Sequence, residues 1–502
     1  MAGAGAGDPR RVKLRHLAAY GTGDIYGVGA FVIIGLLFMY FLTDVVRLGA
    51  FWAGLVVMLG KAWDALSDPL MGHISDHTRS RLGRRRVFFA AGVAPVGVTF
   101  ALLWLPVRPE SAGLTFAYFA LAYVLFSTCF TMVMVPYAAL NAEMSRDYAT
   151  RTRLSAARMV FGGLSTLVVG AVPREVVRAF DSPQTGHLVM GLVFGVYFAL
   201  PWLVVYLGTW ELPAARPGRA ARRGAWRALI AVYRGLGGVL ANRSFRVHMG
   251  MYICAYSAID ILMATIIYYL TYYVDRAGAF AVVVLCMLVA QLGAVVFYVR
   301  VANRHGKGRA YGLGMAIWGA VLVAGMWIVR PDSATVTLVV LFVLAGAGMA
   351  AGAMMPWAIL PSITDVDELI TGEQRAGVYA GSMTFIRKLV QALVLFGVGA
   401  TLRWIGYVPD QPQSPETLAG LRQLFHLAPA AFIAAGVVFS TRFRITPRTH
   451  AVLTAEIARL RAGGDRDGAA PETRAVCELL TGLPYERLYP RRDPGAGTTG
   501  GA

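Results

Sequence analysis

Charged residues are scarce in this chain. They make up 15% of its 502 residues, whereas soluble domains carry about 25%. Apolar residues make up 57%, and they gather in recurring runs that reach the roughly 20 residues a helix needs to cross a bilayer. These two features disfavour an unusually apolar soluble enzyme. They predict an all-α protein that crosses a lipid bilayer many times.

Several marks of other protein classes are missing. The four cysteines show no metal-ligand spacing, and no glycine-rich phosphate loop is followed by Lys-Ser/Thr. ATP-driven transport and cofactor chemistry are therefore not expected. The N-terminus shows no cleavable signal, because the basic residues near it precede an apolar stretch too long for a signal core. That stretch is expected to be the first membrane span.

The net charge of +19 is unevenly placed. Arginines concentrate in alternate loops, and the loop after the second span carries a cluster of five: Arg79, Arg81, Arg84, Arg85 and Arg86. This asymmetry fits the positive-inside rule and not a nucleic-acid-binding surface. We expect a multi-pass protein of the inner (plasma) membrane with both termini in the cytoplasm, and no nucleic acid as partner.

Twelve spans are predicted, in two groups of six. They cover residues 17–43, 48–71, 87–107, 113–140, 154–178, 186–210, 245–273, 277–301, 310–330, 334–360, 376–405 and 421–442. The basic stretch RVANRHGKGR (300–309) follows span eight as SDHTRSRLGRRR (75–86) follows span two. Two halves with a repeated basic turn are typical of transporters that hold substrate near the bilayer midplane.

The predicted domains follow from these spans. A cytoplasmic N-terminus (1–16) precedes the first six-helix half (17–210), and a hydrophilic central loop (211–244) leads to the second half (245–443). In the cytoplasmic tail (444–502) we expect helices over 449–461 and 471–480 and a disordered, glycine-rich end.

Two carboxylates stand out within span two. Asp64 and Asp68 are four residues apart, so a helix places them on one face, one turn apart. A carboxylate at this depth costs about 2.5–3.5 kcal/mol, which favours a functional use. The pair could hold Na⁺ or share a proton, with the Thr131 hydroxyl as a further oxygen ligand. The alternative is a structural pair neutralised by Lys61.

Other charged residues lie inside predicted spans. Asp24, near the cytoplasmic end of span one, either pairs with a loop arginine or belongs to a gate. Arg158 and Lys388 are cations that need partners, and each could reach the carboxylate pair or a polar substrate. Asp260 is a carboxylate with no partner evident in the sequence.

The turn after span two has its own pattern. Gly72 is expected to permit a tight helix end, and Asp76 to accept hydrogen bonds from arginines such as Arg79 or Arg84. These four residues are predicted to form a breakable cytoplasmic latch between the two halves. Topology determination by positive charge alone would explain the arginines but not Gly72 and Asp76.

Three motifs carry a family resemblance. KAWDALSDPLMGHISDHTRSRLGRRR (61–86), VPYAALNAEMSRDYATRTRLSAARM (135–159) and TDVDELITGEQRAG with FIRKLVQAL (364–393) resemble segments of the glycoside–pentoside–hexuronide:cation symporters. These include the melibiose permease and belong to the major facilitator superfamily. The resemblance runs from about residue 13 to residue 444 and implies the major facilitator fold.

The resemblance also implies roles. Asp64 and Asp68 would bind the coupling cation, Ser67 and Thr131 would stand nearby, and Arg158 and Lys388 would shape the cavity. The sugar-binding residues depart from the pattern. In gapless register, the two sugar-binding aspartates of the melibiose permease fall on Val28 and Met134, its stacking tryptophan falls on Ala138, and an acidic residue of span eleven falls on Ala376.

We therefore expect a monomeric secondary transporter that imports a small solute, most simply a glycoside or related sugar, by alternating access with Na⁺ or H⁺. The lost carboxylates leave open a lysophospholipid-like or other amphiphilic substrate. A membrane-embedded enzyme would need a catalytic constellation that we do not find. A sensor would need an output domain, and the tail from residue 445 is shorter than the usual domain of about 100–150 residues.

Overall fold

The computed structural model describes residues 12–109, 111–145, 147–211, 238–373 and 375–489. These residues form helices and connecting turns, and no strand. Most of the central loop and the glycine-rich end of the tail lie outside the described residues, so the expectations for them are not addressed.

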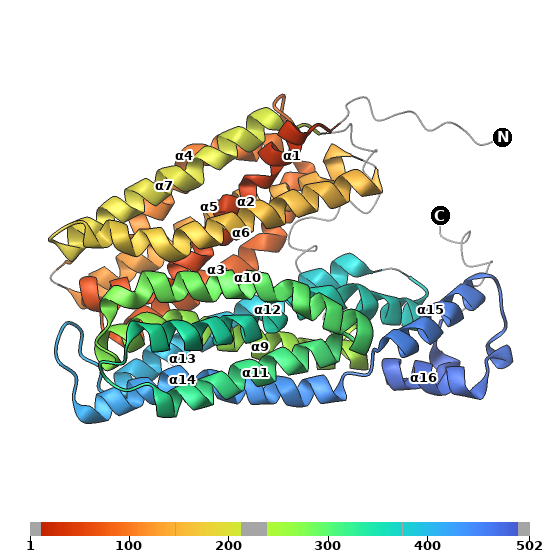
Figure 1. The fold of residues 1–502 in the computed structure, drawn as a ribbon. Helices are drawn as coiled ribbons and strands as arrows, with labels where there is room; N and C mark the ends of the chain where they lie inside the picture. The colour runs from red at the N-terminus through yellow and green to blue at the C-terminus, as the bar shows by residue number, and fades with distance from the viewer. Residues whose placement is uncertain (1–11, 110, 146, 212–237, 374, 490–502) are drawn as a thin grey trace.

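The N-terminal half is one helical body, shown in red to yellow in Figure 1. Within it α4 packs against α7, α3 against α5, and α2 against α6. Its elements are α1 (Leu14–Gly21), α2 (Gly23–Ile33), η1 (Ile34–Phe38), η2 (Phe41–Val45), α3 (Ala50–His77), α4 (Arg86–Leu103), α5 (Ala112–Met144), α6 (Tyr148–Arg178) and α7 (Pro183–Gly208).

The C-terminal half lies beside it, in green to blue. Its helix α12 packs between α10 and α11, and α9 packs against α14. Its elements are α9 (Arg243–Tyr268), η4 (Tyr269–Tyr273), η5 (Ala277–Ala279), α10 (Phe280–His305), α11 (Lys307–Ile328), α12 (Thr335–Thr371), α13 (Ala376–Trp404) and α14 (Pro415–Arg442).

Eleven helical segments of the described chain are long and apolar enough to cross a membrane. Helix α3 has the length but falls outside this set. It carries Lys61, Asp64 and Asp68, which lower its hydropathy. The fold is thus the expected all-α membrane architecture, with α3 the charged exception.

An internal repeat is visible where the first helix of each half ends. The sequence YFLTDVV (40–46) matches YYLTYYV (268–274), and both segments contain a π-helical turn, η2 and η4. Each turn is followed by a residue with positive φ, Arg47 (65°) or Asp275 (56°). Non-glycine residues with positive φ are uncommon, so the two segments share an unusual backbone geometry as well as a sequence.

The halves contact each other most closely along α3 and α13. A Cβ atom on Gly399 would lie 2.4 Å from the carbonyl oxygen of Ala50, and one on Gly54 would lie 3.1 Å from that of Phe396. Only glycine permits this approach, as in other membrane helix pairs. The contact brings the middle of α3, with its carboxylates, against the middle of α13.

The tail forms a helical hairpin against the C-terminal half (Figure 1). As predicted, α15 (Pro447–Arg461) buries Leu453, Ile457 and Leu460 on one stripe, and α16 (Pro471–Thr481) follows. Arg461 forms an ion pair with Glu368 at the end of α12, and His450 contacts Asp365 at 2.7 Å. Because α15 and α16 dock on α12 and α9, the tail is a packed part of this half.

Candidate functional site

The two carboxylates of α3 share one hydroxyl neighbour. Thr131 Oγ1, on α5, donates within 3.2 Å of Asp64 Oδ1 and 3.0 Å of Asp68 Oδ1, and its oxygen lies 3.1 Å from Ser67 Oγ. Asp64 is fully buried, and the side chain of Asp68 is 29% exposed. Helical spacing within α3 and the packing of α5 against α3 therefore bring together the four residues predicted as a cation site. Oxygen ligands of this kind suit hard cations.

A cation from the other half contacts the same carboxylates. Lys388 Nζ, on α13, lies 2.9 Å from Asp64 Oδ2 and 2.5 Å from Asp68 Oδ2. The lysine side chain is 15% exposed, so these contacts are largely shielded from water. One ammonium against two carboxylates leaves one negative charge and ties α3 to α13.

Lys61 does not neutralise the pair. In the described chain it makes no ion pair with Asp64 or Asp68, and its Nζ lies 3.4 Å from the centre of the Phe31 ring. The neutralising role that the sequence allowed for Lys61 belongs in this structure to Lys388. The sequence could not reveal this, because the contact joins residues 320 positions apart.

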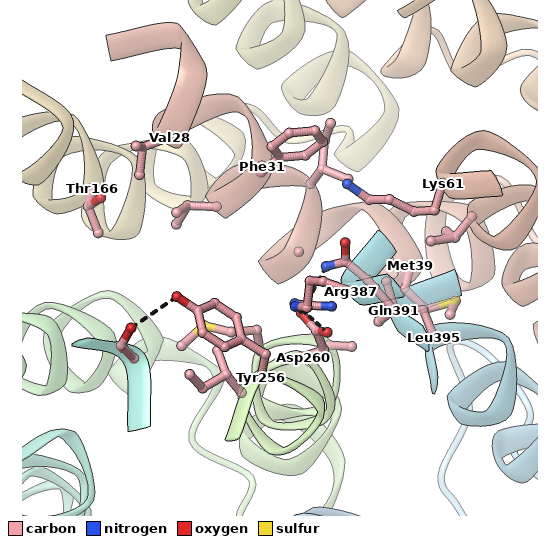
Figure 2. A pocket seen from close by; sticks show the side chains of 18 of the residues that line it. Val28, Phe31, Met39, Lys61, Thr166, Tyr256, Asp260, Arg387, Gln391 and Leu395 are labelled. Atoms are coloured by element: carbon pink, nitrogen blue, oxygen red, sulfur yellow. Dashed lines mark hydrogen bonds and ion pairs between the residues drawn. The ribbon is translucent and has the colours of Figure 1, made fainter. Parts of the chain in front are cut away.

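A cavity of about 570 Å³ lies between the halves beside this cluster. Both halves line it, mostly with apolar side chains such as Val28, Met263 and Leu288. Its polar wall comes from Lys61 on one side and Tyr256, Asp260, Arg387 and Gln391 on the other (Figure 2). A pocket of this size and character suits a small organic molecule.

Asp260 has partners that the sequence did not reveal. Arg387 Nη2 lies 2.7 Å from Asp260 Oδ2 and 2.9 Å from Oδ1, and Gln391 Nε2 donates to the same Oδ1 at 2.9 Å. The carboxylate that had no evident partner in the sequence is therefore paired in the structure. Arg387 immediately precedes Lys388 in the FIRKLVQAL motif, a signal that could have drawn attention to it.

Among the residues predicted to line the substrate cavity, Val28 does so. Met134 packs against Gly27, where an added Cβ would lie 2.5 Å from Met134 Cε. Ala138 is exposed. Lys388 reaches the carboxylate cluster instead of the cavity wall.

Asp24 and Arg158 form one buried pair within the N-terminal half. Arg158 Nε and Nη2 donate to the two carboxylate oxygens at 2.7 and 3.0 Å, and the guanidinium lies 4.6 Å from the centre of the Tyr137 ring. The partner of Asp24 is therefore an arginine of α6, and not one in a loop. A bidentate pair of this kind fixes α2 against α6.

The observed turn after α3 differs in two respects from the predicted cytoplasmic latch. Helix α3 does not end at Gly72; it continues to His77. A Cβ atom added to Gly72 would lie 3.8 Å from Val135 Cγ1, an ordinary distance, so the position does not require glycine. Asp76 pairs with Arg85 at 2.5 Å, and Arg84 pairs with Glu143 at 2.5 Å. Both pairs lie within the N-terminal half.

Arg85 and Glu211 organise this turn. Arg85 is 5% exposed and also contacts Glu143 at 3.0 Å. Glu211, at the end of the half, accepts the backbone N–H groups of Arg84, Arg85 and Arg86, each at 2.8 Å. It therefore caps the start of α4. Arg79 is exposed, and the role of the turn as a latch between halves stays a prediction.

The two repeated turns meet at the opposite end of the molecule from the tail (Figure 1). Thr43 Oγ1 lies 2.8 Å from Tyr268 Oη, and Asp44 Oδ1 accepts hydrogen bonds from Tyr272 and, at 2.5 Å, from Tyr407. We call these contacts the η2–η4 clasp. Sequence reasoning missed it, although the repeat of YFLTDVV in YYLTYYV marked its two sides.

Within the described ranges, no group of three or more His, Cys, Asp or Glu side chains could hold a metal ion. The cation site predicted on Asp64 and Asp68 has two carboxylates, with the hydroxyl groups of Ser67 and Thr131 beside them. Its Na⁺ or H⁺ would be a transported species and not a resident cofactor.

The geometry accords with sequence comparison. Residues 19–447 match the model of the family described as MFS/sugar transport protein. The chain belongs to this family. The membership covers nearly the whole chain and bears out the resemblance that the three motifs carried. The chain is thus a transporter and not an enzyme, and the sensor alternative loses its basis.

Relatives cover nearly the full length. A putative sulfoquinovose importer of Salmonella typhimurium is 28% identical, over 93% of this chain and 98% of its own. An uncharacterized symporter of Synechocystis sp. is 27% identical, over 86% and 94%. The glucuronide carrier protein homolog of Escherichia coli is 24% identical, over 89% and 96%.

Solved transporter structures share the fold. A nucleoside transporter aligns with a TM-score of 0.58 at 13% identity, over 86% of this chain and 99% of its own. A D-xylose–proton symporter aligns with a TM-score of 0.58 at 15% identity, over 85% and 96%. At these identities the likeness shows the fold alone. The chain is a multi-span secondary transporter of the sugar-transport type.

Proposed function

We propose that this transporter imports a glycoside or related sugar together with Na⁺ or H⁺, and that Asp64 and Asp68 bind the coupling ion. The observation that carries the proposal is the contact of Lys388 with both carboxylates. The same oxygens would serve the coupling ion. The ion and the lysine therefore compete for one site.

This competition supplies a coupling mechanism. Without the ion, Lys388 neutralises part of the buried charge and holds α3 to α13. When Na⁺ or a proton binds Asp64 and Asp68, the lysine is displaced and that tie between the halves is lost. A ligand shifts a conformational equilibrium only through its different affinity for the two states. Here the affinity for the coupling ion differs because Lys388 competes for Asp64 and Asp68 only while the two helices are in contact.

The conformation supports an assignment of sidedness. The halves meet at the η2–η4 clasp and diverge toward the end where the tail lies (Figure 1). With the tail placed in the cytoplasm by the positive-inside rule, this is a state closed to the outside. The contact of Lys388 with both carboxylates is the arrangement that the proposal expects once the coupling ion has left. We place the protein in the inner membrane and take it to act as a monomer.

The names of two relatives of this chain favour a sugar over an amphiphile as the substrate. One is a putative sulfoquinovose importer and the other a glucuronide carrier protein homolog. The apolar part of the cavity wall favours the second candidate, a lysophospholipid-like substrate. The polar cluster around Asp260 is better suited to a molecule rich in hydroxyl and charged groups, and this decides our preference.

Uptake into proteoliposomes tests the proposal. Sugars and lysophospholipids are offered with Na⁺ and pH gradients imposed separately, and the Asp64→Asn variant is compared with Asp181→Asn, a control at an exposed loop carboxylate. We expect Asp64→Asn to lose gradient-driven accumulation and Asp181→Asn to keep it. Normal accumulation by Asp64→Asn would contradict the proposed ion site.

A further inference from the structure

A second cavity, of about 260 Å³, lies beside the η2–η4 clasp, at the end of the molecule opposite the tail (Figure 1). The end of α6, the turn after it and the start of α7 form most of its wall, together with Tyr40 and Val45, and Ile267 comes from α9 of the other half. It shares no described lining residue with the central cavity. Two arginines, Arg174 and Arg178, line it, and its described lining contains no carboxylate.

The guanidinium of Arg174 lacks hydrogen-bond acceptors. Its Nε is buried, and the described parts of the chain offer the group neither a hydrogen bond nor an ion pair. It lies instead over the ring of Phe280, 4.9 Å from the centre, and 6.0 Å from that of Tyr40. A guanidinium carries five N–H donors, and ring faces satisfy a cation only in part. Donors of a largely buried cation are therefore left for a ligand in the cavity.

The nearby carboxylates do not supply the missing acceptors. Glu175 pairs with Arg178 at 3.6 Å, and the side chain of the glutamate is 55% exposed. Asp44 acts on Arg174 only from a distance, and its oxygens already accept hydrogen bonds from three hydroxyl groups. Asp181, in the turn after α6, is exposed. These carboxylates can balance the arginines in charge, but none of them fills the cavity with oxygen atoms.

We propose that Arg174 and Arg178 form a binding site for a phosphate-type oxyanion. Two oxygens of the ligand would accept hydrogen bonds from Arg174 in the bidentate manner usual for guanidinium groups. Arg178, whose side chain is 44% exposed, would hold the others at the mouth of the cavity.

Two sources offer this chemistry. The candidate membrane span of α6 ends at Arg178, so the site lies at the depth of lipid headgroups. Inorganic phosphate and the headgroup of an anionic phospholipid present the same oxygens. The site stands apart from the central cavity, so its ligand is independent of the cargo and the coupling ion.

Both halves are needed to complete this site. The arginines come from α6, whereas Ile267 and the ring of Phe280 come from the C-terminal half. Arg178 also lies against η5, because a Cβ atom on Gly278 would be 3.1 Å from its Nη2. Separation of the halves at this end would remove these walls and expose the arginines to water. Since a ligand favours the state that binds it better, the bound oxyanion would stabilise the state in which this end is closed.

Binding to the full-length chain in lipid nanodiscs tests the site in two arms. In discs of phosphatidylcholine, equilibrium dialysis measures the binding of ³²P-labelled inorganic phosphate. In discs that also contain phosphatidylglycerol and are kept free of phosphate, native mass spectrometry counts the lipids retained on the chain. We expect saturable binding in at least one arm, and the arm that shows it identifies the source of the oxyanion.

Variants assign the binding to the two arginines. Arg174→Gln should weaken it by about tenfold or more, and Arg174→Lys should recover only part of the loss, because an ammonium lacks the planar fork. Arg178→Gln should weaken binding by about threefold to tenfold, and because this side chain is partly exposed, the variant is expected to fold normally. Arg330→Gln is the matched control, because Arg330 is exposed in the turn after α11, at the same end and outside the cavity.

Spin labels on the two halves at the clasp end report the conformational effect. The ligand that binds should lower the fraction of molecules open at this end by about threefold or more in the unaltered chain and not in Arg174→Gln. Three results would overturn the proposal: saturable binding of neither ligand, which would leave only water in the cavity; unchanged binding by Arg174→Gln; or an equal loss of binding in Arg330→Gln. A shift toward the open state would likewise contradict a site completed by both halves.

Discussion

Replacing Lys388 with methionine removes the ammonium that contacts both carboxylates of α3. The change keeps an unbranched side chain of similar length, so packing against Asp64 and Asp68 is largely retained. The two contacts, at 2.9 and 2.5 Å, are lost together. Asp64 and Asp68 then face each other with the Thr131 hydroxyl as their shared donor.

The free-energy cost of removing the Lys388 ammonium follows from the burial of the two carboxylates that it contacts. Removal of one partner from a buried ion pair costs about 3–5 kcal/mol, because the remaining charge is uncompensated. Asp64 is 1% exposed and Asp68 29%, so water relieves part of the cost at Asp68 and the lower end of that range applies. A coupling ion can recover this free energy by binding. At about 1.4 kcal/mol per tenfold, the affinity for the ion should rise by about a hundredfold.

The assay is ion binding to the purified variant, measured by ²²Na⁺ equilibrium dialysis and by proton release at fixed pH. Lys307→Met serves as the control for loss of a lysine elsewhere in the C-terminal half. We expect Lys388→Met to bind the ion more tightly and to exchange substrate across the membrane, but to lose net uptake because the ion is not released. Binding of the ion no tighter than in the unaltered chain, or weaker, would refute competition between lysine and ion.

Three further outcomes are expected. Asp64→Asn should remain folded and lose gradient-driven accumulation while keeping substrate exchange, as radiolabel counterflow in proteoliposomes can measure. Tyr407→Phe removes a donor to the buried Asp44 of the clasp and should raise the fraction of molecules open at that end by about tenfold, measured by electron–electron distances between spin labels on the two halves; an unchanged distribution would remove the clasp from the closing contacts. In the tail, the hydrogen bond from Arg459 lowers the pKa of Glu456 below its ordinary value of 4.5, so the stabilising contribution is present at neutral pH and is lost as the pH falls through that lowered pKa. Hydrogen exchange of α16 should therefore accelerate on acidification, and Glu456→Gln should flatten this dependence.

The positions of the helices followed from hydropathy, but several ends did not. Helix α12 was expected to end at residue 360 and runs to Thr371. Its last turns carry Asp367 and Glu368, which hydropathy reads as a loop. In the structure Arg375 and Arg461 neutralise them. The partner of Glu368 comes from the tail, far along the chain, so no local window of sequence contains this ion pair.

The candidate site also has a part that the sequence predicted and a part that it did not. Helical periodicity placed Asp64 and Asp68 on one face, and this needed only their spacing. The partner of the pair required knowledge of which helix crosses α3, and that depends on the close approach of Gly54 and Gly399. Arg387 and Lys388 are adjacent, so a helix directs them about 100° apart. One serves the cavity and the other the carboxylates, although the sequence presents them as a single basic motif.

The location of Lys388 on the opposite half from Asp64 and Asp68 would give the proposed ion site a mechanical effect. A lysine on the same half as Asp64 and Asp68 would neutralise the pair equally well, but its displacement would change nothing between the halves. Placed on α13, it makes the charge state of α3 a contact across the interface. Lys61, which shares a helix with the pair, lacks this property and remains turned toward Phe31 and the cavity. Of the two lysines, Lys388 is therefore the one whose contact between the halves would be broken by an ion bound at Asp64 and Asp68.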